Sequence, residues 1–323
     1  MITVLMATRN RAAILGEVLE RYATVEAPRH GWKLVVVDNG SRDQTRQTVE
    51  AFVGRIPVAY VLEETPGKNA ALRTGFPRAE GDLLILTDDD VLPCHDYLLQ
   101  YEAAAKRLPA FDMFGGPVLL RWHHPPEPWM TENPEILGPT FAATLRSWRE
   151  GPTTQVLFGG NFAVRRALLR AEDFNPAIGP VEGISFAMGE EAVLQRRLEL
   201  RGCRKYWLEG ATVEHIIRPE QMNRKWLLRR AIRYGKGRYM QAALDGEKAY
   251  SVLGIPRWAI RRYITEASRF AVAWARGRSQ AALEARWKMN QIWGYMEEAR
   301  KTHYQARPGR DSTTKSLPRT QGS

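Results

Sequence analysis

Short apolar runs alternate with helical patterns along the first hundred residues of the chain. Four runs are rich in leucine or β-branched residues and end at polar residues, Gly or Pro, which is typical of buried strands. They span residues 3–7, 33–38, 58–63 and 82–87. Apolar side chains at helical spacing occupy residues 11–24 and, more weakly, 43–53. Alternating strands and helices predict an α/β fold with a mostly parallel central sheet flanked by helices.

Polar clusters follow all four predicted strands. They are TRNR at residues 8–11, DNGSRD at 38–43, a glycine-bearing loop at 64–75 and three aspartates at 88–90. Each cluster alone is equally consistent with a turn that caps the next helix. In open α/β sheets, however, ligands bind beyond the carboxyl ends of the strands. The four clusters together therefore predict a ligand site at one edge of the sheet.

Asp88, Asp89 and Asp90 put three negative charges side by side at a strand end. Buried carboxylates are costly unless they are hydrogen-bonded, paired or bound to a cation. Hard oxygen ligands suit Mg²⁺ or Mn²⁺ bound jointly with phosphate oxygens. The alternative is a solvated turn in which Asp90 or Asp96 caps a helix over residues 95–108. The triplet by itself leaves both interpretations open.

The basic charge of the chain lies in its C-terminal third. The 323 residues carry a net charge of +11, and from Arg218 onward there are 23 Lys and Arg against 8 Asp and Glu. Two cysteines, Cys94 and Cys203, argue against a disulfide framework or a cysteine zinc site and favour a reducing compartment. The N-terminus has the pattern of a strand rather than a signal peptide, and no apolar run has the length of a membrane-spanning helix. A soluble or peripheral protein is therefore expected.

Seven motifs occur in an order that carries a family resemblance: ATRNR, VVVDNGSRDQT, PGKNAALRTG, ILTDDDVLP, GGNFAVRR, GEEAVLQRRLELRG and EHIIRPE. Over roughly residues 1–240 the chain resembles glycosyltransferase family 2. The resemblance implies a GT-A fold, with a nucleotide-sugar half and an acceptor half around one sheet. It also implies an inverting reaction, in which an acceptor hydroxyl attacks the anomeric carbon opposite a nucleoside diphosphate. The Gln-x-x-Arg-Trp motif and membrane helices of processive members do not occur here, so single-sugar addition is expected.

The resemblance assigns the nucleotide side of the site to residues at the strand ends. It places Thr8 and Arg11 in the nucleotide pocket and Asp38 at the base. Lys68, in the glycine-led loop, is expected near the ribose or the diphosphate.

The resemblance assigns the diphosphate end of the site to the acidic triplet. Asp88 is expected on the nucleotide side and Asp90 as the direct ligand of Mn²⁺ or Mg²⁺, with Asp89 between them. A bound metal would stabilise the charge that develops on the departing nucleoside diphosphate. His215 matches a family histidine that contacts metal or phosphate and is the second expected metal ligand, although a lone histidine is equally consistent with a structural role.

Glu191 aligns with the general-base aspartate of the family and keeps the carboxylate on a side chain longer by one methylene. The alternative role for Glu190 and Glu191 is structural: their negative charges would complement the positive end of the helix dipole at a helix N-terminus. The two glycines before Asn161 are consistent with a close backbone approach to a donor sugar, which makes Gly160 and Asn161 expected donor contacts. Asn161 is equally an ordinary turn residue.

A Pro- and Trp-rich connection between residues 113 and 158 is expected to build the acceptor site. Its tryptophans are Trp122, Trp129 and Trp148. The sequence leaves three roles open for them: stacking on a sugar, contact with a lipid, or filling a small core of their own.

The C-terminal third predicts basic helices. Residues 223–239 form a helical pattern whose basic face includes Arg233, placed to hold the diphosphate or an anionic lipid. Residues 256–278 predict an Arg-rich amphipathic helix with tryptophan, which resembles an interfacial membrane segment. The alternative is a helix docked on the catalytic core, and residues 281–299 predict a second helix able to pair with it. A polar, disordered tail is expected over residues 304–323.

These observations predict a GT-A domain over residues 1–217, with halves 1–112 and 113–217, followed by a basic helical extension over 218–303. The expected activity is that of a metal-dependent hexosyltransferase at the cell envelope. It would move one sugar from a nucleoside-diphosphate sugar, with a UDP-sugar favoured, to a saccharide or lipid-linked acceptor. A cytoplasmic protein is expected, peripheral at the inner membrane face through contact with anionic lipid.

Two other classes of protein compete with this prediction. A sugar-phosphate nucleotidyltransferase would share the α/β core, but it would open on a glycine-rich basic loop where this chain has ATRNR. A nucleic-acid- or membrane-binding protein would explain the basic third, yet nucleic-acid binding leaves the acidic strand-end site unexplained. No nucleic-acid partner is therefore expected.

Overall fold

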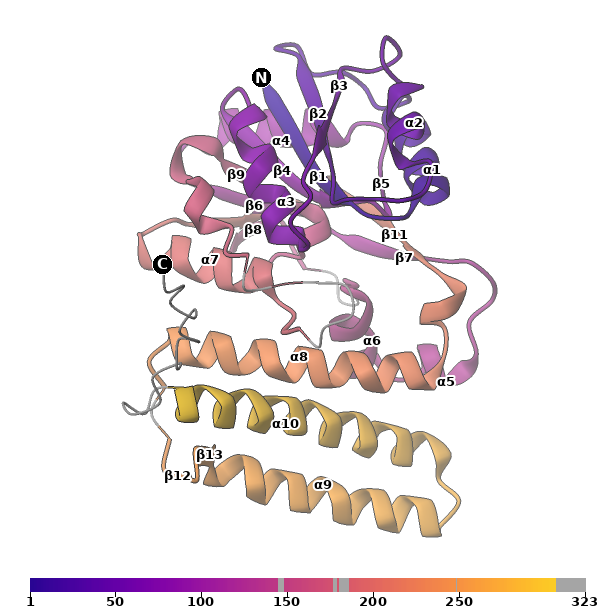
Figure 1. Cartoon of the computed structure of the whole chain (residues 1–323), viewed down its shortest axis with the longest axis vertical. Coiled ribbons are helices and arrows are strands. Elements are labelled where there is room, and N and C mark those ends of the chain that lie inside the picture. The colour runs from indigo at the N-terminus through magenta and orange to yellow at the C-terminus, as the bar shows by residue number, and fades with distance from the viewer. Residues whose placement is uncertain (145–147, 177–178, 180–185, 248, 306–323) are drawn as a thin grey trace, which may run out of the picture.

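The computed structural model describes residues 1–144, 148–176, 179, 186–247 and 249–305. Most of the predicted tail lies outside the described residues, and the last helix reaches Gln305. At the centre of the fold is a sheet in the order β3-β2-β1-β4-β9-β6-β10-β8, with a smaller sheet in the order β5-β11-β7 beside it (Figure 1). The strands of these sheets are β1 (Ile2–Thr8), β2 (Trp32–Asp38), β3 (Val58–Leu62), β4 (Leu83–Asp88), β5 (Val91–Pro93), β6 (Met113–Gly115), β7 (Val118–Trp122), β8 (Gly151–Thr153), β9 (Phe162–Arg165), β10 (Lys205–Trp207) and β11 (Val213–Ile217).

The four strands predicted from the apolar runs form the parallel half of the large sheet. β1 pairs with β2 and β4, and β2 pairs with β3, all in parallel. β9 runs antiparallel between β4 and β6, which makes the other half of the sheet mixed. The predicted α/β class, with a mostly parallel sheet flanked by helices and helices at the C-terminal end, is confirmed.

Helices cover both faces of the large sheet, so its inner strands are apolar on both sides. Val4 and Met6 of β1 join one apolar cluster with the first and fourth helices, and Leu5 joins the other with the third and seventh. Buried strands of this kind are nearly continuous apolar runs, and most of their polar groups stand at their ends. The helices before the C-terminal third are α1 (Ala12–Tyr22), α2 (Thr45–Glu50), α3 (Lys68–Gly75), α4 (Tyr97–Arg107), α5 (Pro128–Thr131), α6 (Pro134–Phe141) and α7 (Glu190–Leu200).

The three tryptophans of the connection between residues 113 and 158 are half-buried and pack against other side chains of the protein. Trp122 meets the ring of Phe141 edge-on, and Trp148 meets Trp207 at a centroid distance of 4.4 Å. Trp129 packs against the small cluster around Phe141. Of the roles left open by the sequence, the structure therefore supports core packing.

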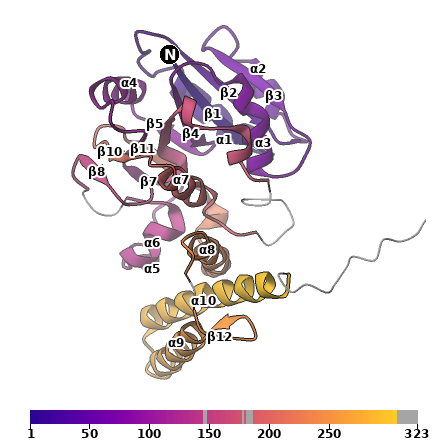
Figure 2. The same ribbon diagram turned by 90° about the vertical axis from the view of Figure 1, so that its left-hand side faces the viewer.

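Three long helices form a stack below the sheets (Figures 1 and 2). They are α8 (Arg224–Leu244), α9 (Arg257–Ala275) and α10 (Ser279–Gln305), and a two-stranded ribbon of β12 (Ser251–Val252) and β13 (Ile255–Pro256) precedes α9. α10 lies between α8 and α9, so the predicted pairing of the last two helices is confirmed, and α9 packs on α10 rather than on the sheets. Among the described residues, no helix is both long and apolar enough to cross a membrane.

Glycines allow α8 and α10 to approach each other backbone to backbone. A Cβ atom on Gly235 would lie 1.8 Å from the carbonyl oxygen of Gln291, and one on Gly294 would lie 1.9 Å from that of Ile232. No side chain fits at these distances, so the close helix contact requires glycine at both positions.

We expect Gly294→Ala to lower the free energy of unfolding by about 1–3 kcal/mol, because overpacking forces the two helices apart. Urea denaturation of the purified variant measures this change. Gly16→Ala in α1 is the matched control, since its Cβ would meet only Thr48 Cγ2 at an ordinary 3.6 Å. The control should be neutral or stabilised by up to about 1 kcal/mol. Equal effects of the two substitutions would contradict the packing account.

Candidate active site at the strand ends

A cavity of about 500 Å³ opens at the carboxyl ends of β1 and β4, and α7, α8 and β11 contribute to its lining. The parallel strands bring segments that are distant in sequence to this single edge. Ten of the twelve residues expected in the site line the cavity: Thr8, Arg11, Lys68, Asp88, Asp89, Asp90, Gly160, Glu191, His215 and Arg233.

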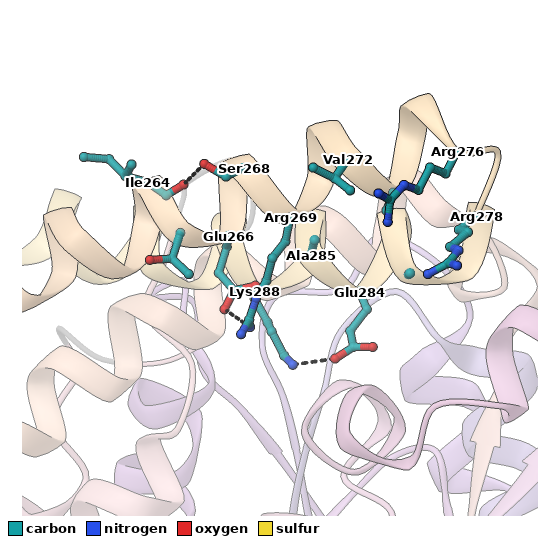
Figure 3. Close-up of a pocket in the computed structure, with 13 residues that line it drawn as sticks. Ile264, Glu266, Ser268, Arg269, Val272, Arg276, Arg278, Glu284, Ala285 and Lys288 are labelled. Atoms are coloured by element: carbon teal, nitrogen blue, oxygen red, sulfur yellow. Dashed lines mark hydrogen bonds and ion pairs between the residues drawn. The ribbon is translucent and has the colours of Figure 1, made fainter.

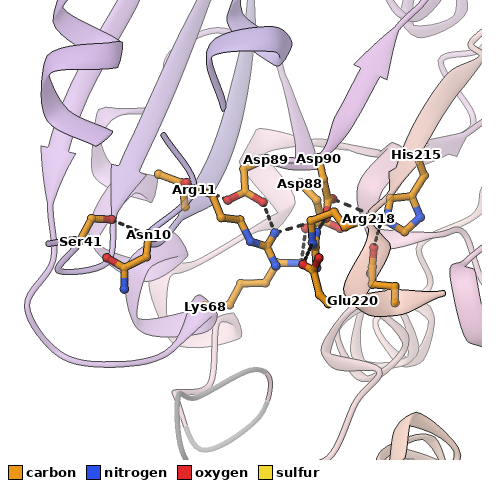
Figure 4. Close-up of polar contacts among 12 residues, drawn as sticks. Asn10, Arg11, Ser41, Lys68, Asp88, Asp89, Asp90, His215, Arg218 and Glu220 are labelled. Carbon is orange, nitrogen blue, oxygen red and sulfur yellow. Dashed lines mark hydrogen bonds and ion pairs between the residues drawn. The ribbon is translucent and has the colours of Figure 1, made fainter. Parts of the chain in front are cut away.

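A cation from another segment holds each of the first two aspartates of the triplet (Figure 4). The Asp88 carboxylate lies 2.5 Å from Nζ of Lys68, the first residue of α3. Asp89 accepts a hydrogen bond from the Thr8 hydroxyl at 2.7 Å and pairs with the Arg11 guanidinium at 2.5 Å. Burial opposes the charge on Lys68, but Asp88 and the nearby glutamates outweigh burial and raise the pKa of the lysine.

Asp90 is 5% exposed and lies among three basic side chains. Nη1 of Arg218 is 2.5 Å and Nη1 of Arg11 is 3.2 Å from Oδ2, while Nε2 of His215 is 3.6 Å from Oδ1. Burial alone would raise the pKa of Asp90, but His215, Arg11 and Arg218 together lower it far below its ordinary value. The carboxylate is therefore ionised at neutral pH.

The environment of His215 fits a divalent metal ion. Its Nδ1 lies 2.7 Å from the carbonyl oxygen of Phe141, which can only accept, so Nδ1 carries a proton. In the neutral ring the lone pair is then on Nε2, which faces Oδ1 of Asp90. Two facing acceptors require a proton or a cation between them, and a metal-binding histidine commonly has this second hydrogen bond.

Asp90 and His215 would supply only part of a metal ion's ligands. Within the described ranges, no group of three His, Cys, Asp or Glu side chains is placed to hold a metal ion. Mg²⁺ and Mn²⁺ commonly take one or two protein ligands and complete their coordination with phosphate oxygens and water. The residues present therefore fit a cation that arrives with a phosphate-bearing ligand.

The two glutamates at the start of α7 have different surroundings. Oε1 of Glu190 lies 3.2 Å from Nζ of Lys68, whereas Glu191 forms no ion pair in the part of the chain that is described. Burial first, and the charge of Glu190 second, raise the pKa of Glu191 to about 7. An unpaired carboxylate with this pKa can accept a proton near neutral pH, as a general base must.

α8 contributes positive charge and an aromatic ring from the opposite wall of the cavity. Arg230 lies over the Trp226 ring at 5.1 Å from its centroid, and Arg233 lies over Phe186 at 4.9 Å. Nε of Arg230 is buried, and within the described residues it has no hydrogen-bond partner. Burial first, and then Arg233, lower the pKa of Arg230 to about 10, so the guanidinium stays charged at neutral pH. Guanidinium groups in this setting suit an anionic ligand.

Asp38 lies at the predicted strand end, but its side chain does not line the cavity. Its carboxylate accepts hydrogen bonds from the Ser41 backbone N–H and the Tyr60 hydroxyl, each at 2.8 Å. The next residue, Asn39, lines the cavity in its place.

Asn161 is fully buried and does not reach the cavity either. Its Oδ1 accepts hydrogen bonds from the hydroxyls of Tyr97 and Tyr101, and its Nδ2 donates to the carbonyl oxygens of Pro117 and Ala211. These four bonds use the whole amide, so the observed role of Asn161 is to join α4 to two loops. The backbone of Gly160, just before it, does line the cavity.

Arg218, Trp226 and Arg230 are among the cavity residues that were missing from the sequence-based set. Arg218 stands three residues after His215 in EHIIRPE, so its place in the same motif was an available signal. Trp226 and Arg230 belong to the helix whose basic face was predicted, but the pattern alone did not fix which of its side chains turn toward the sheet edge.

The fold is that of a GT-A-like α/β protein, and a cavity lined by charged side chains lies at its strand ends. The family model described as glycosyl transferase family 2 matches residues 3–171. The chain belongs to this family, as its seven ordered motifs indicated.

Relatives with known names match parts of the chain. The undecaprenyl-phosphate 4-deoxy-4-formamido-L-arabinose transferase of Pseudomonas fluorescens is 30% identical over 118 residues, which are 35% of this chain and 34% of that protein. The validoxylamine A glucosyltransferase of Streptomyces hygroscopicus subsp. jinggangensis is 34% identical over 106 residues, which are 32% of this chain and 25% of that protein. The match thus spans about a third or less of the length of these relatives.

A solved structure supports the fold over nearly the whole chain. The mannosyltransferase PcManGT from Pyrobaculum calidifontis, in complex with GDP-Man and Mn²⁺, superposes with a TM-score of 0.54 at 18% identity. The superposition covers 94% of this chain and 75% of that one. At this level of identity, the likeness establishes a shared fold.

We expect Asn161→Ala to lower the free energy of unfolding by about 2–4 kcal/mol, because it leaves several buried polar groups without partners. Thermal and urea denaturation measure the loss. Asn223→Ala at the N-cap of α8 is the matched control and should cost about 1 kcal/mol. A loss at Asn161 no larger than that of the control would argue against the structural role.

Proposed function

We propose that this protein is an inverting, metal-dependent glycosyltransferase. It transfers one sugar from a nucleoside-diphosphate sugar to a hydroxyl of a lipid-linked or other cell-envelope acceptor. The observation that carries the proposal is a carboxylate without an ion pair in the described structure, Glu191, in the same cavity as a cation-balanced aspartate triplet. A base and a diphosphate-binding end in one cavity are the two requirements of this reaction.

The diphosphate of the donor fits between the aspartate triplet and α8. Asp90 and His215 would hold Mn²⁺ or Mg²⁺, which would neutralise charge on the departing diphosphate when bound. Arg230 and Arg233 line the same cavity from α8, and Arg230 has no carboxylate within ion-pair distance in the described part of the chain. Fixed positive groups aimed at developing negative charge lower the barrier to departure. A UDP-sugar is the first donor to test.

Glu191 is proposed as the general base. It takes the proton of the acceptor hydroxyl while the oxygen attacks the anomeric carbon, and the bond from that carbon to the diphosphate oxygen breaks on the opposite face. Lys68 pairs with Glu190 and Asp88, whereas Glu191 has no ion pair among the described residues. Gly159 makes room beside it, since a Cβ there would lie 3.3 Å from Cβ and Cγ of Glu191.

The acceptor is proposed to enter beside Trp226. This half-buried ring lines the cavity, and because Phe141 stacks on it and Arg230 lies over it, an acceptor would meet the edge of the ring. The name of the Pseudomonas fluorescens relative specifies a lipid phosphate, undecaprenyl phosphate, and that of the Streptomyces relative specifies a glucosyl transfer. Together with the basic C-terminal helices, these names support a lipid-linked or saccharide acceptor at the inner face of the cell membrane.

We expect Glu191→Gln to lower kcat by about 10²–10⁴-fold, because the amide cannot accept the proton. Radiolabelled sugar transfer measures the rate, and the affinity for the nucleoside diphosphate should change little. The exposed Glu247→Gln variant is the matched control and should keep its rate. Full activity of Glu191→Gln, or an equal loss in the control, would remove Glu191 from this role.

The pH dependence tests the same residue independently. The base must be ionised, and the pKa of Glu191 is raised to about 7, so kcat/KM should rise with pH through about 7 and then level off. Activity is lost below that pH because the carboxylate takes up a proton. Glu191→Asp should keep part of the rate and shift the rising limb. The pH range to compare is about 6 to 8, about one unit either side of that pKa. A flat profile over this range would contradict the role of Glu191 as the base.

We expect Mn²⁺ to raise the thermal midpoint of the protein in the presence of a bound nucleoside diphosphate. At concentrations about 100-fold above Kd, the stabilisation would be about 2.7 kcal/mol. Asp90→Asn and His215→Gln should each abolish the metal-dependent part of the shift. Asp96→Asn, at the start of α4 and outside the cavity, should respond as the wild type does. A wild-type response of the His215 variant would exclude His215 as a ligand.

A further inference from the structure

α9 forms the outermost layer of the molecule, on the side away from the sheets (Figures 1 and 2). Its buried residues, Ala259, Glu266 and Ala273, mark the face that packs on α10. The helix is about 28 Å long. Most of its remaining circumference is open to solvent in the described structure.

The solvent-exposed surface of this helix is positively charged. Its one acidic residue, Glu266, is 1% exposed, and Oε1 of that residue lies 3.1 Å from Arg262 and 3.0 Å from Arg269. The exposed arginines of the helix and of the turn that follows are Arg257, Arg261, Arg262, Arg269, Arg276 and Arg278.

Large apolar side chains stand among these arginines. Trp274 is 74% exposed, Ile264 60% and Val272 50%. A groove of about 660 Å³ between α9 and α10 places Ile264 and Val272 beside Arg269 and Arg276 (Figure 3). Exposed apolar and cationic groups on one helix are the composition of an interfacial segment.

We propose that the exposed face of α9 binds the surface of an anionic lipid bilayer. Its arginines would contact acidic headgroups, and Trp274, Ile264 and Val272 would insert beneath them. Nucleic acid offers the same negative charge, but its phosphate backbone gives no apolar phase to these three side chains. The composition of the surface therefore favours the bilayer.

The helix stack sets how far the catalytic cavity stands from such a membrane. Two interaxial spacings, from α9 to α10 and from α10 to α8, separate α9 from the helix that lines the cavity, or about 16–20 Å. An acceptor hydroxyl must reach across this distance. If the proposed glycosyl transfer is correct, a lipid-linked acceptor would need sugars that extend its hydroxyl about this far from the headgroups.

Flotation with vesicles tests the membrane contact without any turnover. The full-length protein should float with phosphatidylcholine vesicles containing about one third phosphatidylglycerol and not with pure phosphatidylcholine, and salt should weaken the binding. Arg261→Glu/Arg276→Glu should reduce binding by more than about tenfold. Arg29→Glu/Arg78→Glu changes the net charge equally at other exposed positions and should bind as the wild type does. Trp274→Ala should also weaken binding.

Hydrogen exchange then locates the contact. Vesicles should protect amides of residues 257–276 and leave those of the cavity rim and α8 unchanged. Equal binding by the two double variants, protection at the cavity rim, or retention by duplex DNA but not by vesicles would overturn the proposal. Thermal midpoints of the variants exclude misfolding, and transfer to a soluble saccharide acceptor reports the catalytic proposal separately.

Discussion

The neutralisation of Asp88, Asp89 and Asp90 is the constraint on which the rest of the site depends. Three adjacent carboxylates at the end of a buried strand repel one another, and removing them from water is costly unless cations lie beside them. Lys68 comes from α3, Arg11 comes from the loop after β1, and Arg218 comes from the segment after β11. The charge balance thus fixes how these three segments meet at the sheet edge.

The same constraint bears on how the cavity would bind and release the proposed anionic ligand with its cation. Arg218 and Arg11 share Oδ2 of Asp90, while Oδ1 faces Nε2 of His215. One side of the carboxylate is therefore satisfied by protein, and the other side is the part that a metal would use. Binding would complete an existing arrangement of charges rather than create one, which limits the reorganisation that catalysis requires.

Close backbone contacts hold the base and α8 relative to each other. A Cβ on Gly237 of α8 would lie 1.7 Å from the carbonyl oxygen of Met188, and the Met188 N–H donates to the carbonyl oxygen of Arg233 at 3.1 Å. Met188 stands three residues before Glu191. The segment that carries the proposed base is therefore fastened to the helix that carries the proposed anion-binding arginines, and α10 supports that helix from behind.

The sequence predicted the parts of the site that follow from sheet geometry. Parallel strands end at a common edge, so the meeting of Thr8 with Asp89 could be expected although 81 positions separate them. The rotation of a side chain about its own backbone does not follow from such reasoning. Asn161 turns into the core because two tyrosine hydroxyls and two carbonyl groups surround it there.

Prediction of the helical C-terminal third was limited in the same way, because local patterns do not show how distant elements pack. Periodicity predicted its helices and the pairing of the last two, because apolar spacing is a local property of the sequence. It did not predict that α10 would separate α9 from the rest of the protein, because this depends on glycine contacts between distant helices. The inward turn of Arg230 likewise depends on where α8 crosses the sheet edge.

Calorimetric titration with UDP, GDP and dTDP, each with and without Mn²⁺, tests the central claim most directly. The account predicts that one nucleoside diphosphate binds with a stoichiometry of about one when Mn²⁺ is present, and that the monophosphate of the same base binds at least about tenfold more weakly, a difference of about 1.4 kcal/mol. If no diphosphate binds, or if a nucleoside triphosphate binds and releases pyrophosphate instead, the cation-balanced cavity is not a nucleotide-sugar site.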